Sequence, residues 1–346
     1  MNPLVLTTFL LTLGLGTTIV FSSSHWALAW MGLEINTMAI LPLMARHHHP
    51  RSVEATTKYF LTQATAAAMI LFAGISNAWL TGHWDMMQTT HPLISALLTF
   101  ALALKLGLAP FHAWLPEVLQ GLDLVTALIL STWQKLAPFV ILMQIQPATP
   151  LVFVLLGLLS ILVGGWGGLN QTQLRKILAY SSIAHLGWMI LALQFSPLLA
   201  LFTLIMYVVM TSSVFLILNF NNLKTIASLS ISWSKSPVIT CLIPLTLLSL
   251  GGLPPLSGFA PKWLILKELT MQALPISATL AALSALLSLY FYLRLCYAAA
   301  LTMAPHQITT SILWRVTRWL VVLPLAVFTI ATIMLLPILP ALALFI

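Results

Sequence analysis

The sequence predicts an all-α, polytopic membrane protein with about 11 transmembrane helices. Of the 346 residues, 60% are hydrophobic and only 6% are charged, whereas a soluble domain carries about 25% charged residues. Apolar runs of about 20 residues, the length that a spanning helix needs, recur along the whole chain. These runs lack the alternating polarity of a membrane β-barrel. A helical membrane protein is therefore expected.

The apolar runs define the predicted helices, and Pro or clusters of Asn, Gln and Ser separate them. The predicted spans are 3–20, 25–45, 58–80, 93–121, 123–144, 150–168, 174–194, 198–219, 238–273, 275–299 and 319–340. We expect them to form a single membrane domain over residues 1–346. The N-terminus has neither a basic n-region nor an Arg-rich amphipathic stretch, so no removable targeting peptide is visible.

The basic residues indicate the orientation of these spans. If the N-terminus lies on side A and the chain alternates, ten of the 14 Lys and Arg residues fall on side A: Arg46, Arg51, Lys58, Arg175, Lys176, Lys224, Lys235, Arg294, Arg315 and Arg318. Side B holds Lys267, and three lysines remain inside the membrane. The positive-inside rule makes side A the cytoplasmic or matrix side. Because the charges are scattered singly, they do not indicate nucleic-acid binding.

Two spans are longer than one crossing requires. At about 1.5 Å per residue, 238–273 would extend well beyond a hydrocarbon core of about 30 Å. A Gly/Pro break interrupts this span at 250–258, and another interrupts 93–121 at 106–110. Backbone groups that a break frees need water or protein partners. A hydrated cavity at mid-depth is therefore predicted.

The two breaks are five spans apart, so the segments that contain them cross the membrane in opposite directions. Paired interrupted helices of this kind indicate a transporter built from inverted repeats. We expect residues 1–144 to form the first five-helix repeat and 150–299 the second, with helices 4 and 9 broken. Residues 319–346 would add a C-terminal helix.

Four ionisable residues fall near predicted membrane centres: Glu34, Lys105, Lys135 and Lys262. A charged side chain there costs about 2.5–3.5 kcal/mol on insertion scales. The lysines could snorkel to an interface or act as fixed structural counter-charges. Alternatively they handle protons, since burial disfavours the ammonium form and a nearby carboxylate favours it. Glu34 is the only acid placed within the membrane, so it is the expected partner of Lys105 or Lys135.

Other candidate sites give weaker signals. His112 follows the first break and His185 lies in the middle of 174–194. Each histidine could relay protons or be a hydrogen-bonded packing residue, and the sequence does not decide between these roles. The tract 47–49 of three histidines fits a solvated loop better than a metal site. Cys241 and Cys296 have no CxxC or Cys/His spacing, so no metal or bound cofactor is expected.

Three motifs resemble a known family. They are Ala-Leu-Lys105-Leu-Gly-Leu-Ala-Pro-Phe-His112-Ala-Trp-Leu-Pro-Glu117, Leu-Ala-Tyr180-Ser-Ser-Ile-Ala-His185-Leu-Gly-Trp-Met and Gly-Gly-Leu-Pro-Pro-Leu-Ser-Gly-Phe-Ala-Pro-Lys262-Trp. Together they resemble the antiporter-like membrane subunits of respiratory complex I, and the resemblance covers nearly the whole chain. Any one motif alone would fit the wider cation/proton antiporter family.

The resemblance implies a proton-translocating subunit of the mitochondrial inner membrane, with the N-terminus on the matrix side and the C-terminus on the intermembrane-space side. It implies that Glu34 pairs with Lys105, that Lys135 is the central lysine, and that Lys262 lies on the outlet side. NADH, FMN, iron–sulfur clusters and ubiquinone would bind to other subunits.

The resemblance also implies partners. Bacterial relatives begin with three further helices, and the side left open here would be covered by a neighbouring subunit or by lipids such as cardiolipin. Subunits 4L and 4 of the complex are the expected neighbours. Two other functions remain open: a stand-alone cation/proton antiporter, and a proton-inactive structural subunit that keeps its lysines for assembly.

Overall fold

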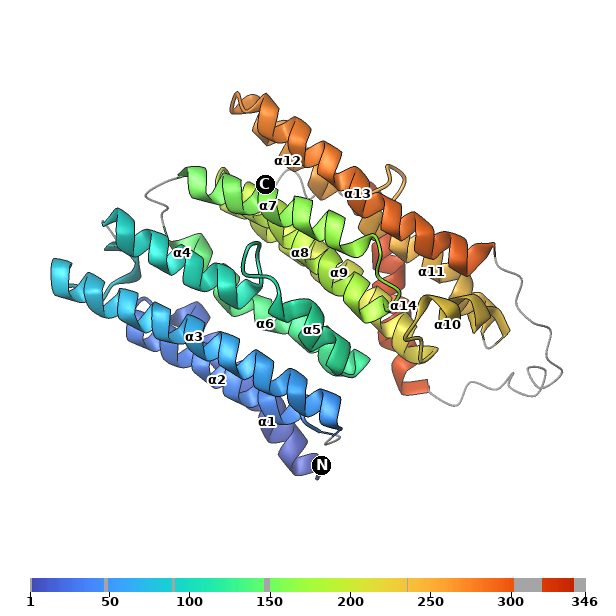
Figure 1. The fold of residues 1–346 in the computed structure, drawn as a ribbon, viewed down its shortest axis with the longest axis horizontal. Coiled ribbons are helices and arrows are strands. Elements are labelled where there is room, and N and C mark those ends of the chain that lie inside the picture. The colour runs from blue at the N-terminus through green and yellow to red at the C-terminus, as the bar shows by residue number, and fades with distance from the viewer. Residues whose placement is uncertain are drawn as a thin grey trace. The chain divides into compact units, whose positions relative to one another are not determined.

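A computed structural model describes residues 2–46, 49–88, 91–145, 150–234, 236–301 and 319–338. Helices make up nearly all of these ranges (Figure 1). The only strand-like contacts among the described residues are two isolated bridges, His25–Asp85 and Gln173–Thr225. The predicted all-α class is confirmed. The basic residues Lys235, Arg315 and Arg318, and His47 and His48 of the histidine tract, lie outside the described ranges.

The chain divides into two compact units, residues 1–156 and 157–346. The first unit contains α1 (Pro3–Ser22), α2 (Trp26–Met44), α3 (Pro50–Thr81), the short η1 (Met86–Gln88), α4 (Pro92–Leu106), α5 (Trp114–Gly121) and α6 (Leu124–Gln144). Helix α7 (Pro150–Gly168) crosses the boundary between the units.

The second unit continues with α8 (Leu174–Leu193), α9 (Pro197–Phe220), α10 (Ile226–Ser230), η2 (Ile231–Ser234), α11 (Pro237–Gly251), α12 (Phe259–Met271), α13 (Pro275–Ala300), α14 (Trp319–Met334) and η4 (Leu336–Ile338). Among the described residues, eight helices are long and apolar enough to cross a membrane. Three shorter apolar helices are Pro92–Leu106, Pro237–Gly251 and Val322–Met334.

Most helix ends lie within a few residues of the prediction, but α3 begins earlier than expected. It starts at Pro50 instead of residue 58, because proline suits the first helical position and the His49 side chain accepts a hydrogen bond from the Arg51 amide. Arg51 and Lys58 were expected in, or at the end of, the loop before this span. Both therefore lie within the first three turns of α3 instead.

Both long segments are broken where the sequence predicted. Gly107 caps the C-terminus of α4 and Gly252 caps that of α11, with φ of 79° and 78°. Glycine adopts this left-handed conformation without the steric cost that a Cβ brings. At the first break the amides of Gly107 and Leu108 both donate to the Ala103 carbonyl, and at the second the amides of Gly252 and Leu253 both donate to the Leu248 carbonyl. The two helices therefore end in the same type of cap.

The two breaks also match in length, but their lysines do not match in register. Helices α4 and α11 have 15 residues each, and the breaks cover 107–113 and 252–258. When the two capping glycines are aligned, Lys105 corresponds to Leu250 and Lys262 to Glu117. Lys105 therefore precedes its break within the first half-helix, whereas Lys262 follows its break within the second.

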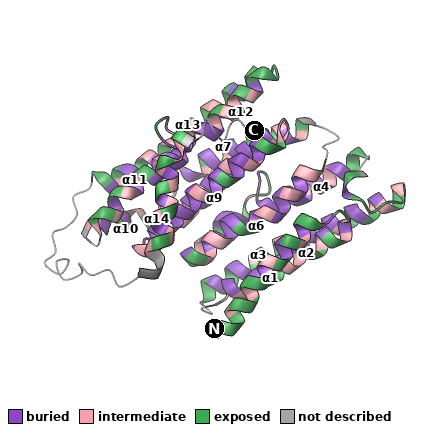
Figure 2. Cartoon of the chain, turned by 180° about the vertical axis from the view of Figure 1, so that it is seen from behind, coloured by how far each residue is buried: buried purple, intermediate pink, exposed green. Residues whose placement is uncertain are grey.

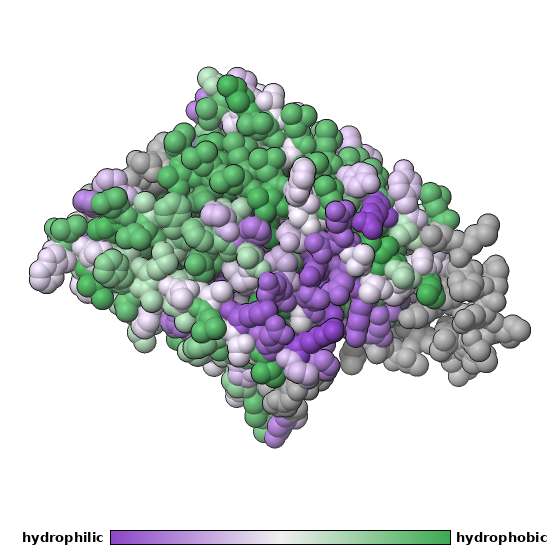
Figure 3. Space-filling view, viewed as in Figure 1, coloured by the Kyte–Doolittle hydropathy of each residue, from purple (hydrophilic) through white to green (hydrophobic). Residues whose placement is uncertain are grey.

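The outer surface suits a lipid environment. Large apolar side chains are exposed on many helices, including Phe72 on α3, Leu283 on α13 and Trp79, which is 87% exposed. Figure 2 shows buried and exposed residues on the same helices, and Figure 3 shows hydrophobic residues over much of the visible surface. Large apolar side chains exposed on so many helices fit a surface that contacts a membrane.

Candidate functional site

The first unit encloses a small cavity that both Lys105 and Lys135 line. Its lining comes from α2, α3, α6 and the broken α4–α5 segment: Leu33, Asn36, Thr37, Tyr59, Gln63, Lys105, Leu106, Trp114, Leu115, Leu130, Gln134, Lys135 and Pro138. The volume is about 20 Å³, which is room for about one water molecule. The sequence predicted a hydrated cavity at this break, and the structure contains a cavity of suitable size and polarity there.

The two cavity lysines are almost completely buried. Lys105, in the last turn of α4, is 5% exposed, and Lys135, in the middle of α6, is 4% exposed. Lys105 Nζ has no hydrogen-bond partner among the described residues. Both side chains line the same cavity, so one water molecule there could contact both amines.

Glu34 lies close to this cavity, on the side of α2 that faces outward. It lines an open, mainly apolar groove of about 450 Å³ together with side chains of α1, including Thr8 and Thr12. Thr37 lines the lysine cavity, and its hydroxyl donates to the Glu34 carbonyl at 2.8 Å and, in a longer contact of 3.2 Å, to Glu34 Oε2. Glu34 also interacts electrostatically with Lys105. Glu34 and Lys105 are thus coupled through space without a direct hydrogen bond.

Lys262 belongs to the second unit and lies at the other break. It is half-buried at the start of α12, and its Nζ donates to the Gly251 carbonyl at 2.7 Å. Gly251 is the last residue of α11. A cation at a helix C-terminus is favourable, because the final carbonyl groups are unpaired and carry partial negative charge. This contact gives Lys262 a capping function.

Neither predicted histidine lines the lysine cavity. His112 is half-buried in the first break, and its Nδ1 is buried without a hydrogen-bond partner among the described residues. His185 lies on α8 in the second unit, where its ring contacts the Tyr207 ring with centroids 5.7 Å apart. Among the described residues, no three His, Cys, Asp or Glu side chains gather as metal ligands would.

Several polar residues of the cavity were missed from the sequence. Gln63 Nε2 donates to the Lys105 carbonyl at 3.4 Å, and Gln134 Nε2 donates to the Asn36 carbonyl at 3.2 Å. Trp114 Nε1 donates to the Leu104 carbonyl at 3.1 Å. For Gln63 and Gln134 the sequence did contain a signal, namely an amide side chain in the middle of an apolar helix. A polar group there costs free energy for the same reason as a charge.

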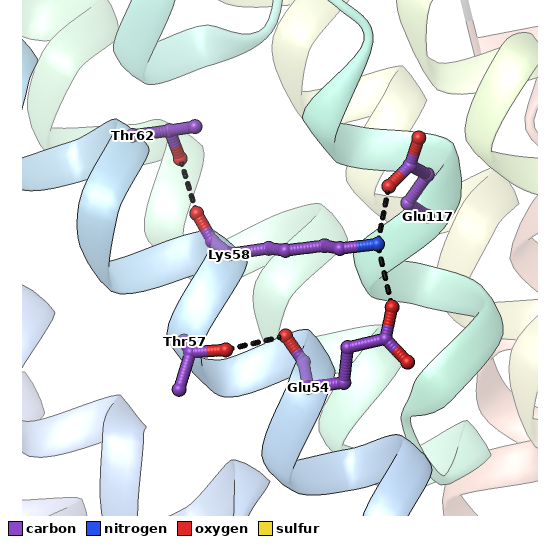
Figure 4. A network of polar contacts seen from close by, with 5 residues as sticks. All are labelled: Glu54, Thr57, Lys58, Thr62 and Glu117. Carbon is purple, nitrogen blue, oxygen red and sulfur yellow. Dashed lines mark hydrogen bonds and ion pairs between the residues drawn. The ribbon is translucent and has the colours of Figure 1, made fainter.

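A second polar cluster lies at the surface beside α5. Lys58 Nζ is 2.7 Å from both Glu54 Oε1 and Glu117 Oε2 (Figure 4). Glu54 and Lys58 are one turn apart on α3, whereas Glu117 lies on α5. The three side chains are partly exposed, so each ion pair is weak on its own. The cluster nevertheless links α3 to the second half of the broken helix.

The sequence of this chain matches known families and relatives over nearly its whole length. Residues 23–288 match the family described as NADH:quinone oxidoreductase/Mrp antiporter, and residues 289–343 match the C-terminus of NADH dehydrogenase subunit 2. NADH-ubiquinone oxidoreductase chain 2 of Salmo salar is 65% identical over 342 residues, which cover 99% of this chain and 98% of the relative. The same chain of Danio rerio is 60% identical over 342 residues, with the same coverage of both chains.

Solved structures share the fold. A chain of respiratory complex I from Thermus thermophilus is 29% identical, with a TM-score of 0.84 over 98% of this chain and 80% of that one. A chain of the Mrp complex from Dietzia has a TM-score of 0.77 at 19% identity, over 86% of this chain and 61% of that one. The second likeness concerns the fold alone.

Proposed function

The chain belongs to the NADH dehydrogenase subunit 2 family of respiratory complex I, and on that premise we propose that it carries protons through the buried lysines Lys105 and Lys135. As a member, it is a multi-pass inner-membrane subunit of an enzyme complex, and other subunits of that complex are its partners. The observation that carries the proposal is the cavity that both lysines line.

The proposed transfer uses the coupling between Glu34 and the two lysines. When the carboxylate interacts with Lys105, a proton on that amine is favoured. When the interaction weakens, the proton leaves Lys105 through water in the cavity for Lys135. Thr37, which lines the cavity and whose hydroxyl lies 3.2 Å from Glu34 Oε2, would connect the two parts of the path.

The later steps of the proposed path involve Lys262 and the two histidines. Lys262 would deliver the proton to the outlet side, and His112 and His185 would be secondary relays. For Lys262 the hydrogen bond to the Gly251 carbonyl also supports a purely structural role as a helix cap. The matching caps at Gly107 and Gly252 support two inverted repeats, residues 1–144 and 150–299.

We place this subunit beside others that would hold the redox groups of the complex. NADH, FMN, iron–sulfur clusters and ubiquinone would act in other subunits, and this chain would supply the proton path. Subunits 4L and 4 would be the neighbours. The open groove beside Glu34 has the apolar lining that a lipid such as cardiolipin, or a neighbouring helix, would cover. The N-terminus would face the matrix.

The test uses the assembled complex, purified and reconstituted into liposomes. Lys105→Met and Lys135→Met keep an unbranched side chain one atom shorter and remove the charge, and we expect each to lower the number of protons translocated per electron. Lys267→Met, at an exposed site on α12, is the matched control and should have no effect. Full stoichiometry in both cavity variants, with an unchanged quinone reductase rate, would rule out proton transfer through this site.

A further inference from the structure

Helix α3 contacts both halves of the broken helix within six residues of its own chain. Lys58 binds Glu117 on α5 at 2.7 Å, and the Tyr59 ring packs on the Trp114 ring of α5 with centroids 5.7 Å apart. Deeper in the unit, Gln63 donates to the Lys105 carbonyl at the end of α4. These contacts extend from the surface to the lysine cavity.

The last turn of α4 depends on donors from outside the helix. The final carbonyls of any helix have no intrahelical partner, and here the chain leaves the helix at Gly107. The Leu104 carbonyl accepts from Trp114 Nε1 at 3.1 Å in addition to the Gly107 amide at 3.2 Å, and the Lys105 carbonyl accepts from Gln63 Nε2. Both donors are buried and line the cavity. The backbone that carries the Lys105 side chain is therefore held by α3 and α5.

The half-helix that carries Trp114 is in turn fixed to α3. The end of α5 packs so closely that a Cβ on Gly121 would lie 2.6 Å from the Arg51 carbonyl oxygen. Glu117, one turn after Trp114, completes the attachment through Lys58. A displacement of α5 would move Trp114 and leave the Leu104 carbonyl with only the 3.2 Å hydrogen bond from the Gly107 amide, which weakens the end of α4.

We infer that Gln63 and Trp114 are positioning residues that hold the end of α4 and thereby aim Lys105 into its cavity, and that the Lys58–Glu117 pair secures the half-helix that carries Trp114. This inference rests on the proposed function of Lys105. It assigns no proton to Gln63 or Trp114, since neither side chain titrates. They act by fixing where the Lys105 amine meets water and Lys135.

Several titratable groups surround Lys105, so its position affects the pH dependence of proton translocation. Tyr59 from α3 and Lys135 from α6 face the same cavity, and Glu34 interacts with Lys105 from α2. His112 lies in the break beside α5, and at the surface Glu54, Lys58 and Glu117 form their own cluster. A misplaced Lys105 amine changes its distance to Tyr59, Lys135 and Glu34. The pH dependence of proton translocation would then shift, which a general loss of folded protein would not cause.

The test compares Trp114→Phe and Gln63→Met in the reconstituted complex. Gln63→Met nearly conserves the side-chain volume, Trp114→Phe keeps a smaller aromatic ring, and each substitution removes the N–H donor. We expect normal assembly, a roughly tenfold slower proton transfer through this subunit, since catalytic rates depend steeply on sub-ångström placement, and a shifted pH profile. In combination with Lys105→Met, neither variant should reduce translocation further, because both act through that lysine. Trp79→Phe and Gln272→Met, both exposed, are the matched controls.

The outcomes separate this inference from the proposed function. If Lys105→Met lowers translocation but Trp114→Phe and Gln63→Met leave its rate and pH profile unchanged, the positioning roles are wrong and the proposed function stands. If Lys105→Met has no effect, the proposed function fails and this inference fails with it. Should Gln63→Met not assemble, Trp114→Phe alone decides the matter, because a phenyl ring keeps an aromatic side chain beside Tyr59.

Discussion

Glu34 illustrates how a single residue on α2 can influence a cavity that it does not line. Its carboxylate faces the groove beside α1, accepts a hydrogen bond from Thr37 and interacts electrostatically with Lys105. In a medium of low dielectric constant such an interaction is weakened less by distance than it would be in water. A neutral isostere at this position should therefore change proton transfer while leaving the packing of α2 intact.

We expect Glu34→Gln to lower the protons translocated per electron, since the amide keeps the shape and the Thr37 hydrogen bond but loses the charge that favours the Lys105 ammonium. The measurement is the proton-to-electron ratio of the reconstituted complex. Glu268→Gln, on α12 of the second unit, serves as the control. An unchanged ratio in Glu34→Gln would separate this carboxylate from the lysine path.

The break itself depends on Gly107. Its φ is 79°, and a Cβ there would lie 2.9 Å from Leu115 Cδ1. We expect Gly107→Ala to destabilise the subunit by about 1–3 kcal/mol, which combines backbone strain with a clash. The amount of assembled complex and its thermal inactivation temperature measure this.

Two other glycines provide controls for Gly107→Ala. Gly82 has a φ of 74° but open space around it, and Gly14 is helical with open space. Gly82→Ala should show the strain alone, and Gly14→Ala should be neutral or slightly stabilising. If Gly107→Ala were as well tolerated as Gly14→Ala, the capping conformation would not matter for assembly.

At the scale of the helices, the sequence predicted the elements well and their mutual contacts poorly. Gly107 and Gly252 marked both breaks, because only glycine fits a left-handed cap easily. The buried lysines stood out because charge is rare in apolar helices. The hydrogen bond from Gln63 to the Lys105 carbonyl joins residues 42 positions apart. No local pattern announces such a contact, since it depends on how α3 packs against the end of α4.

The Lys58–Glu117 pair gives the element-scale prediction. We expect Lys58→Met to increase hydrogen exchange of the α5 amides by up to about fivefold, the effect of losing an exposed ion pair worth about 1 kcal/mol at most. Lys58→Arg, which keeps the charge, should leave the exchange unchanged. Equal exchange in Lys58→Met and Lys58→Arg would mean that close packing at Gly121 alone holds α5.

At the scale of the whole molecule, the distribution of basic residues predicts the orientation in the membrane. Placing ten of the 14 Lys and Arg residues on side A puts the N-terminus and the loop between α7 and α8 on the matrix side. The loop between α1 and α2 should then face the opposite side. This orientation is a proposal that labelling can test.

An impermeant maleimide applied to mitoplasts should label Ser24→Cys, in the α1–α2 loop, but not Thr172→Cys, in the α7–α8 loop. Both residues are exposed. Inverted inner-membrane vesicles should give the reverse pattern. Labelling of Thr172→Cys in intact mitoplasts would place side A on the outer face and invert the proposed direction of transport.

The proton-to-electron ratio of a Lys105→Met/Lys135→Met double variant, measured beside each single variant in the reconstituted complex, tests the central claim most directly. If the two lysines serve one path through their shared cavity, the double variant should lose no more translocation than the more severe single variant. A double variant that translocates as many protons per electron as the unsubstituted complex would contradict the account.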